Sequence, residues 1–219
     1  MTTEQAEGDA RTPGIPERGG SRGKSTREPP APGRVLSIHA HPDDQEFTVA
    51  GTLAKWARAG STVVTGYEDG MLEPSIALRR DLTRVIRRHR PDAVVCGDPT
   101  VRFYGGSYLN HPDHRVAADV TLDAVFPSSE TRLIFPELLD EGLEPHKVQA
   151  VFIHGSERPD TFIDIADVLD VKLAALKQHK TQMGAWDPTE MITAWARQQG
   201  ARRKLKAAES YRLMRLHQP

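Results

Sequence analysis

Two tetrapeptides in the sequence place imidazole groups beside carboxylates: His-Pro-Asp-Asp at 41–44 and His-Pro-Asp-His at 111–114. Adjacent carboxylates repel each other unless a cation, a proton or a helix terminus offsets the repulsion. Imidazole and carboxylate are also the ligands of catalytic zinc sites, which keep one coordination position open for water. The two tetrapeptides therefore indicate either a metal site or two helix starts.

We call the tetrapeptide at 41–44 the first corner and the one at 111–114 the second corner. The helix-start interpretation has support in both corners. Each has proline where the first helical position would be and acidic residues in the first turn, which suits a helix N-terminus. A helix start has no need of histidine, however, and His41, His111 and His114 gather at these two corners. The pair of corners therefore favours a metal site, whereas either corner alone favours a cap.

A single metal ion could draw its ligands from both corners. His41 and Asp44 are three residues apart across a tight turn, and His114 would complete a His-Asp-His set. Zinc held by three protein ligands lowers the pKa of its bound water to about 7. Asp43 is then placed to accept the proton of that water, and His111 to donate to a developing oxyanion. Magnesium is disfavoured because it prefers an all-oxygen shell, whereas iron remains an alternative.

Residues beside the two corners are further candidates for the site. Tyr108 and Asn110 immediately precede the second corner, and we predict that they contact substrate, although as loop residues they could serve only to shape the turn. Asp69, in Gly-Tyr-Glu-Asp-Gly, is expected first as a turn residue and second as a substrate contact. His39 lies inside the first predicted strand and is expected to be packed or hydrogen-bonded rather than to bind metal.

Short apolar runs alternate with segments of helical periodicity from Arg34 onward. Strands are predicted at 35–40, 61–65, 93–96 and 148–153. Helices are predicted at 47–59, 75–89, 112–126, 167–180 and 190–199. This alternation predicts an α/β fold with a mostly parallel sheet, whose ligand site lies at the carboxyl ends of the strands. The first corner follows the first predicted strand, as this rule requires.

The composition predicts one folded domain after a tail. At 219 residues the chain has the length of one ordinary domain. Residues 1–33 contain five prolines, scattered glycines and charges, and no aromatic residue. Such a segment cannot bury enough apolar surface to offset its ordering entropy. We therefore expect a disordered N-terminal tail at 1–33 and a folded domain at 34–219.

Charge and cysteine content limit the partners and the compartment. With 29 basic and 30 acidic side chains there is no net field to attract nucleic acid or an anionic membrane, which favours a small-molecule or protein partner. No apolar stretch is as long as a membrane span, and the N-terminus lacks the apolar segment of a signal peptide. The single cysteine, Cys96, is expected to be a buried thiol. We therefore expect a cytoplasmic protein, whose oligomeric state the sequence does not indicate.

Several stretches resemble the PIG-L/LmbE family of zinc-dependent N-deacetylases, which act on N-acetylglucosamine-type sugars and related amides. The strongest matches are AHPDDQEF followed by AGTLAKWARAG, and SYLNHPDHRVAADVTLDAVFP; the shorter ones are DGMLEP, RPDAVVCGDPT, KLAALKQHKTQ and AESYRL. By motif position the resemblance implies zinc ligands at His41, Asp44 and His114, a general base at Asp43, and stabilisation of the tetrahedral intermediate by His111. It also implies a Rossmann-like three-layer sandwich with the metal at the strand ends, and Asp113 is a candidate for orienting His111.

The sequence departs from the pattern of this family at two places. Gln45 stands where the family usually has glutamate, and the effect is expected to be modest because this residue is not a ligand. The second departure is larger, since the strand at 61–65 runs directly into Gly-Tyr-Glu-Asp-Gly where the family usually inserts a helix and about one strand. We therefore expect a sheet shortened by a helix and a strand, in a region that supplies substrate-binding groups in the family.

Two functions follow from these observations. The first is zinc-dependent hydrolysis of an N-acetyl or N-acyl amide on an amino sugar or related small molecule. The second is a truncated, inactive relative that binds metal or a sugar, or assembles with a partner. The intact corners favour the first function because a base beside the ligands is useful only for turnover, whereas the missing segment favours the second.

Overall fold

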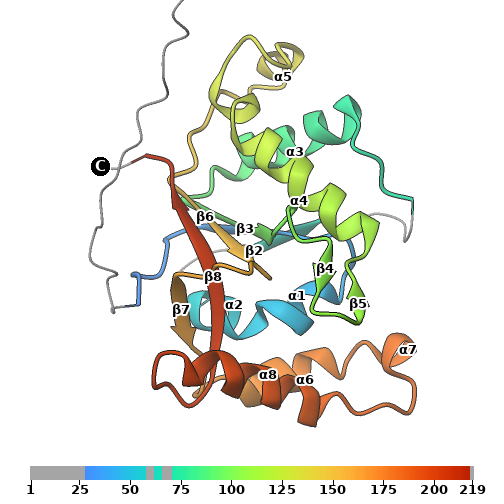
Figure 1. Cartoon of the computed structure of the whole chain (residues 1–219). Helices are drawn as coiled ribbons and strands as arrows, with labels where there is room; N and C mark the ends of the chain where they lie inside the picture. Colours follow the sequence, from blue (N-terminus) through green and yellow to red (C-terminus); the bar gives the residue numbers. More distant parts are fainter. Residues whose placement is uncertain (1–27, 58–61, 66–70, 218–219) are drawn as a thin grey trace, which may run out of the picture.

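The computed structural model describes residues 28–57, 62–65 and 71–217 (Figure 1). Most of the expected disordered tail, residues 1–27, lies outside the described residues. The carboxylate of Glu28 accepts a hydrogen bond from Lys55 Nζ at 3.0 Å and another from the amide of Asp164 at 3.2 Å. Glu28, which belongs to the segment expected as a tail, therefore contacts the folded part of the chain, and the domain bounds stay a prediction.

A six-stranded sheet forms the centre of the fold, in the order β2-β1-β3-β6-β8-β7. Its strands are β1 (Val35–Ile38), β2 (Thr62–Thr65), β3 (Ala93–Gly97), β6 (Ala150–His154), β7 (Thr161–Asp164) and β8 (Ala208–Arg215). The first four strands in this order pair in parallel, while β8 pairs antiparallel with both β6 and β7. The predicted mostly parallel sheet is confirmed, although β7 and β8 were not predicted.

Helices cover both faces of the sheet, as Figure 1 shows. They are α1 (Asp44–Thr48), α2 (Ala50–Ala57), α3 (Ile76–His89), α4 (Pro112–Val125), α5 (Glu137–Asp140), α6 (Leu169–Leu176), α7 (Lys180–Met183) and α8 (Thr189–Ala201), with a single 3-10 turn at Ser128–Glu130. A small hairpin of β4 (Phe103–Tyr104) and β5 (Tyr108–Leu109) precedes α4. This arrangement confirms the predicted three-layer α/β fold.

Alternate strand residues contribute to two separate cores, because successive side chains point to opposite faces of a sheet. On β1, Val35 packs with residues of α2 and α8, and Leu36 packs with residues of α3 and α4. Complete burial of a side chain such as Leu36 contributes roughly 1.5–3 kcal/mol. On β3, Cys96 is a buried free thiol, as predicted, and burial raises its pKa to about 12.

The helix predicted at 47–59 is divided into α1 and α2 by a contact from the far end of the chain. The buried carboxylate of Glu209, on β8, accepts hydrogen bonds from the amides of Gly51 at 3.0 Å and Thr52 at 2.8 Å. A carboxylate at this position satisfies unpaired donors at the start of α2 and interacts favourably with the helix dipole. A Cβ atom at Gly51 would lie 2.8 Å from Ile165 Cγ2, so this close approach requires glycine. The helix predicted at 167–180 is also divided, into α6 and α7.

The carboxyl edge of the parallel strands provides the setting for a site. The chain passes from β1 to β2 on one side and then returns to β3 on the other, so the strand order reverses at β1. Ligands of open α/β sheets bind at such switch points, beyond the carboxyl ends of the strands. Among the described residues, β2 is the edge strand of the sheet next to β1. The helix and strand that the sequence was expected to lack would lie near this edge, and their loss stays a prediction.

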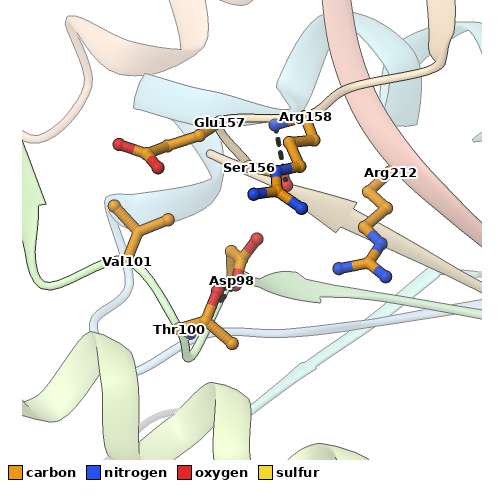
Figure 2. A pocket seen from close by; sticks show the side chains of 7 residues that line it. All are labelled: Asp98, Thr100, Val101, Ser156, Glu157, Arg158 and Arg212. Carbon is orange, nitrogen blue, oxygen red and sulfur yellow. Dashed lines mark hydrogen bonds between the residues drawn. The ribbon is translucent and has the colours of Figure 1, made fainter.

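A pocket of about 260 Å³ lies beyond the ends of β3 and β6 (Figure 2). Its buried Asp98 carboxylate accepts hydrogen bonds from the amide and hydroxyl of Thr100, at 2.9 and 2.6 Å. Burial works to raise the pKa of Asp98, but hydrogen bonds from Thr100 and Ser156 outweigh it and lower this pKa. The pocket is lined by Asp98, Thr100, Val101, Ser156, Glu157, Arg158 and Arg212. No helix of the described residues is long and apolar enough to cross a membrane.

Candidate active site

The first corner forms a tight turn between β1 and α1. Asp43 is the N-cap residue of α1, and its side chain makes no capping hydrogen bond. The carboxylate of Asp44 instead folds back to accept a hydrogen bond from the amide of His41 at 3.0 Å. The turn therefore holds the side chains of His41 and Asp44 near each other, as the sequence predicted.

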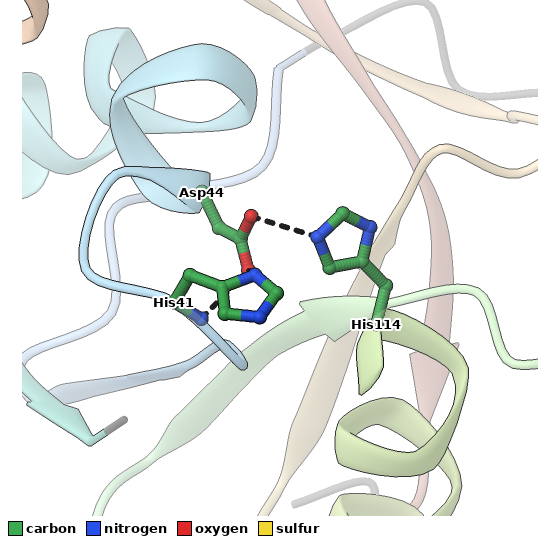
Figure 3. Close-up of side chains that lie close together, drawn as sticks. All are labelled: His41, Asp44 and His114. Carbon is green, nitrogen blue, oxygen red and sulfur yellow. Dashed lines mark hydrogen bonds and ion pairs between the residues drawn. The ribbon is translucent and has the colours of Figure 1, made fainter. Parts of the chain in front are cut away.

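The second corner is both a helix start and part of the site. His111 is the N-cap residue of α4, and its Nδ1 accepts a hydrogen bond from the amide of Asp113 at 3.2 Å. Pro112 occupies the first turn, where its missing N–H costs nothing. His114 lies one turn into α4 and points away from this cap toward the first corner (Figure 3). The capping and site interpretations of this corner are therefore compatible.

His41, Asp44 and His114 form a cluster that could hold a metal ion, since one ligand atom of each lies within 4.8 Å of the others (Figure 3). His114 Nε2 is 2.9 Å from Asp44 Oδ1, and His41 Nδ1 is 3.6 Å from Asp44 Oδ2. All three side chains are partly buried. Two imidazoles and one carboxylate are a suitable ligand set for zinc.

The electrostatics of the cluster suit a cation. Burial works to raise the pKa of Asp44, but the hydrogen bond and charge of His114, together with the amide of His41, outweigh it and hold this pKa well below its usual range. Burial works to lower the pKa of His114, but the hydrogen bond and charge of Asp44 raise it. The pair thus requires positive charge between the carboxylate oxygen and Nε2, which either a proton or a metal ion provides. The residues present therefore fit a metal ion.

A second set, His41, His111 and Asp113, also brings ligand atoms within 4.8 Å of one another. It shares His41 with the first set. Its other members are engaged in the fold, because His111 Nδ1 accepts from the Asp113 amide and Asp113 Oδ1 accepts from the Leu72 amide at 3.3 Å. These contacts favour the first set as the metal site. Asp113 Oδ2 lies 3.4 Å from His41 Nε2, closer than the 4.0 Å between Asp113 Oδ1 and His111 Nδ1, so its carboxylate is nearer to His41 than to the residue it was expected to orient.

Comparison with known proteins connects this geometry to a family. No family model matches the chain. A curated diacetylchitobiose deacetylase of Thermococcus kodakarensis is 28% identical over 205 residues, covering 74% of this chain and 73% of the relative. A 1D-myo-inositol 2-acetamido-2-deoxy-alpha-D-glucopyranoside deacetylase of Mycobacteroides abscessus is 26% identical over 239 residues, covering 70% and 83%. The chain is similar to deacetylases of the PIG-L/LmbE type.

A solved structure supports the same relation at the level of the fold. The N,N'-diacetylchitobiose deacetylase from Pyrococcus horikoshii matches with a TM-score of 0.73 and 23% identity, and the match covers 84% of each chain. The fold expected from the motif resemblance is therefore confirmed. The predicted roles of the individual site residues stay predictions.

Asp43 lies beside the ligand cluster and is 8% exposed. Its Oδ2 accepts a hydrogen bond from Gln182 Nε2, on α7, at 3.3 Å. On the same side, His179 Nε2 lies 3.3 Å from Glu46 Oε2. Gln182 was not predicted from the sequence, although KLAALKQHKTQ, which resembles the family, contains both it and His179. In this chain, α7 therefore supplies a contact to the residue predicted to be the base.

The three residues predicted to contact substrate have different surroundings. Tyr108, on β5, is 55% exposed, and its ring is 6.1 Å from that of Tyr104. Asn110 is 4% exposed, and its side chain contacts Val101 and His114. Asp69 lies outside the described residues. Tyr108 is thus accessible from solvent, whereas Asn110 lies in the interior next to a candidate ligand.

Two other histidines lie next to the cluster. The rings of His39 and His154 stack with centroids 5.2 Å apart, and His39 Nε2 is 2.8 Å from Ser37 Oγ. Burial lowers the pKa of His39 to about 4 and that of His154 well below its usual value. His39 is therefore packed and hydrogen-bonded, as predicted.

Proposed function

We propose that this protein is a zinc-dependent deacetylase that hydrolyses the N-acetyl amide of an amino sugar or a related small molecule. The convergence of His41, Asp44 and His114, with Asp43 beside them, carries this proposal. The relatives named above are deacetylases of 2-acetamido sugars or of diacetylchitobiose, which supports an acetamido sugar as the substrate class. Iron in the same ligand set is the alternative to zinc.

A Zn²⁺ ion held by His41, Asp44 and His114 would supply Lewis acidity that activates water and polarises the acetamide carbonyl. Asp43 would accept a proton from the attacking water as its oxygen bonds to the carbonyl carbon. When the C–N bond breaks, Asp43 would return this proton to the nitrogen, so that a free amine and acetic acid leave, and the acid then loses its proton to water and becomes acetate. The hydrogen bond from Gln182 supports this role because it holds the Asp43 carboxylate in place.

The cap of α4 supports the proposed role of His111. A backbone N–H can only donate, so the bond from the Asp113 amide requires Nδ1 of His111 to be an acceptor. The neutral ring then carries its proton on Nε2. That nitrogen is suited to donate to the oxyanion that develops on the substrate, a contribution typically worth about 3–4 kcal/mol in such sites.

The pocket beyond β3 and β6 would accommodate the part of the substrate away from the acetamide. It combines carboxylates, hydroxyls and guanidinium groups, which together offer donors and acceptors to the hydroxyls of a sugar. Asn110 connects the two places, because its Nδ2 donates to the carbonyl of Val101 in the pocket wall and its Oδ1 contacts His114. The non-catalytic alternative is not favoured, since an acidic residue beside the ligands serves turnover.

The decisive experiment combines metal content with acetate release. We expect purified protein to contain about one zinc per chain, as a single catalytic site requires, and His41→Ala to lose it. We expect the wild-type chain to release acetate from N-acetylglucosamine, N,N'-diacetylchitobiose or the acetamido-glucosyl inositol, with activity removed by a chelator and restored by zinc. A wild-type chain that binds no supplied zinc, or that releases no acetate from these amides, would contradict the proposal.

A further inference from the structure

Asn110 is the only asparagine in the chain and is held rigidly between β5 and α4. Its backbone amide donates to the carbonyl of Arg102 at 2.8 Å, and its backbone carbonyl accepts a hydrogen bond from Arg115 Nη1. Its side-chain Nδ2 donates to the carbonyl of Val101 at 2.8 Å. Its Oδ1 lies 3.2 Å from Nδ1 of His114. Both ends of the buried amide are thus occupied by protein groups.

The direction of these hydrogen bonds follows from the carbonyl of Val101. A backbone carbonyl only accepts, so it must face the NH₂ group of Asn110, which turns the amide oxygen toward His114. An amide oxygen also only accepts, so Nδ1 of His114 must carry a proton. In the neutral ring the lone pair then lies on Nε2, the nitrogen that is 2.9 Å from Asp44 Oδ1. The hydrogen bonds from Val101 through Asn110 to His114 therefore place the ring lone pair on Nε2, the nitrogen that faces the cluster.

We propose that Asn110 is a positioning residue that holds His114 in the Nδ1–H tautomer and so presents Nε2 to the metal ion it shares with Asp44. This inference rests on the proposed metal site and replaces the substrate contact predicted for Asn110 from the sequence. Residues that accept a hydrogen bond from the second nitrogen of a histidine ligand fix its tautomer and ring orientation. Asn110 does so without adding a charge beside the ion.

His41 gives an internal comparison. Its Nε2 lies 3.4 Å from the Asp113 carboxylate, while its Nδ1 faces Asp44. The ring nitrogens directed away from Asp44 therefore face different groups, a nearby carboxylate for His41 and a hydrogen-bonded amide oxygen for His114. A neutral amide leaves less negative charge around the ion than a second carboxylate would, which preserves its Lewis acidity.

Zinc affinity in two variants separates positioning from a merely structural role. Asn110→Leu removes both hydrogen bonds, and we expect its zinc dissociation constant, measured by competition with a chromogenic chelator, to rise about 10- to 100-fold. Asn110→Asp keeps an acceptor for His114 but loses the donor to Val101, and we expect it to bind zinc within a few fold of wild type or more tightly. If the tie to Val101 alone mattered, both variants would weaken zinc binding equally, and the proposal would be wrong.

A matched control lies on the same helix. Thr121 is buried on α4 and donates to the carbonyl of Ala117 at 2.6 Å, away from the cluster. Thr121→Val should lower the unfolding midpoint without changing zinc affinity. Wild-type zinc affinity in Asn110→Leu would overturn this inference alone, whereas absence of zinc binding in the wild-type chain would overturn the metal site and this inference together.

The tautomer is also measurable in the wild-type chain, which removes any dependence on the folding of a variant. In zinc-loaded protein with ¹⁵N-labelled histidine, we expect long-range correlations to show the proton of His114 on Nδ1. Because the chain has one asparagine, selective ¹⁵N labelling gives a single side-chain amide signal, which we expect to be protected from exchange. A proton on Nε2 of His114 in the zinc-loaded protein would refute the assignment.

Discussion

The two corners share three of their four residues but begin their helices at different positions. In the first, the N-cap is Asp43, the third residue, and α1 starts at Asp44. In the second, the N-cap is His111, the first residue, and α4 starts at Pro112. His41 therefore stays outside its helix, where its ring can meet Asp44, whereas the ring of His111 is engaged in capping.

The same shift separates the two aspartates at the third position. Asp43 lies beside the ligand cluster and accepts a hydrogen bond from Gln182. Asp113 is 1% exposed and contacts the amide of Leu72 and the ring of His41. From the second corner, Asp113 reaches the ring of His41, whereas His114, one helical turn beyond its cap, reaches the carboxylate of Asp44. Position relative to the helix start, rather than residue type, thus distinguishes the candidate ligands from their neighbours.

The largest expected difference is between the two histidines of the second corner. His114→Ala should lose zinc and, with it, acetate release, because Asp44 loses the partner that lies 2.9 Å away. His111→Ala should keep zinc but lower kcat about 100- to 1000-fold, the usual cost of removing one oxyanion donor. Zinc content and kcat of both variants give the test. Full zinc occupancy in His114→Ala, or zinc loss in His111→Ala, would point to the second cluster as the metal site.

Substitutions of the two aspartates at the third position should also have different effects, one on turnover and the other on zinc affinity. Asp43→Asn should abolish turnover and keep zinc, since it removes the proposed base and no ligand. Asp113→Asn should weaken zinc binding about 10-fold, because the carboxylate near His41 Nε2 is replaced by a neutral group. Zinc titrations of both variants, with acetate release at saturating zinc, distinguish the roles. Equal zinc loss in both variants would remove the proposed distinction between Asp43 and Asp113.

The sequence predicted the central strands and both corners because their signals are local. Apolar runs identified β1 and β3, and the proline-led corners identified the starts of α1 and α4 to within a few residues. β8 was missed although it alternates buried and exposed residues along most of its length, since β8 and β7 are antiparallel additions at the edge of a parallel pattern. The division between α1 and α2 depends on Glu209, 158 residues from Gly51, and no local pattern contains it. The contact of Gln182 with Asp43 is equally non-local.

Glu209 gives a stability test of the difference between the corners. The first corner leads into α1 and α2, and the start of α2 depends on the Glu209 carboxylate, which also accepts a hydrogen bond from Lys172 Nζ at 2.6 Å. The second corner leads into α4, which is capped by its own His111. Glu209→Gln would leave Lys172 without its buried counter-charge, which typically costs about 3–5 kcal/mol. We expect urea unfolding to show a loss of this size. Amide exchange should accelerate more in α2 than in α4; an equal acceleration in both helices would show that the two corners share one support.

The smallest expected effect concerns the histidines outside the corners. Burial lowers the pKa of His154 well below 6.5, so below that pH the unfolded chain binds a proton that the folded chain does not. Stability should therefore be complete above pH 6.5 and fall as the pH drops, by up to about 1.4 kcal/mol per pH unit for this residue. The raised pKa of His114 acts in the opposite sense, because its contribution is complete below 6.5 and is lost as the pH rises through its folded pKa.

His154→Gln should reduce the slope of unfolding free energy against pH between 6.5 and 5 in metal-free protein. Repacking changes stability at every pH but leaves this slope unaltered, so an unchanged slope would show that His154 does not titrate differently in the two states.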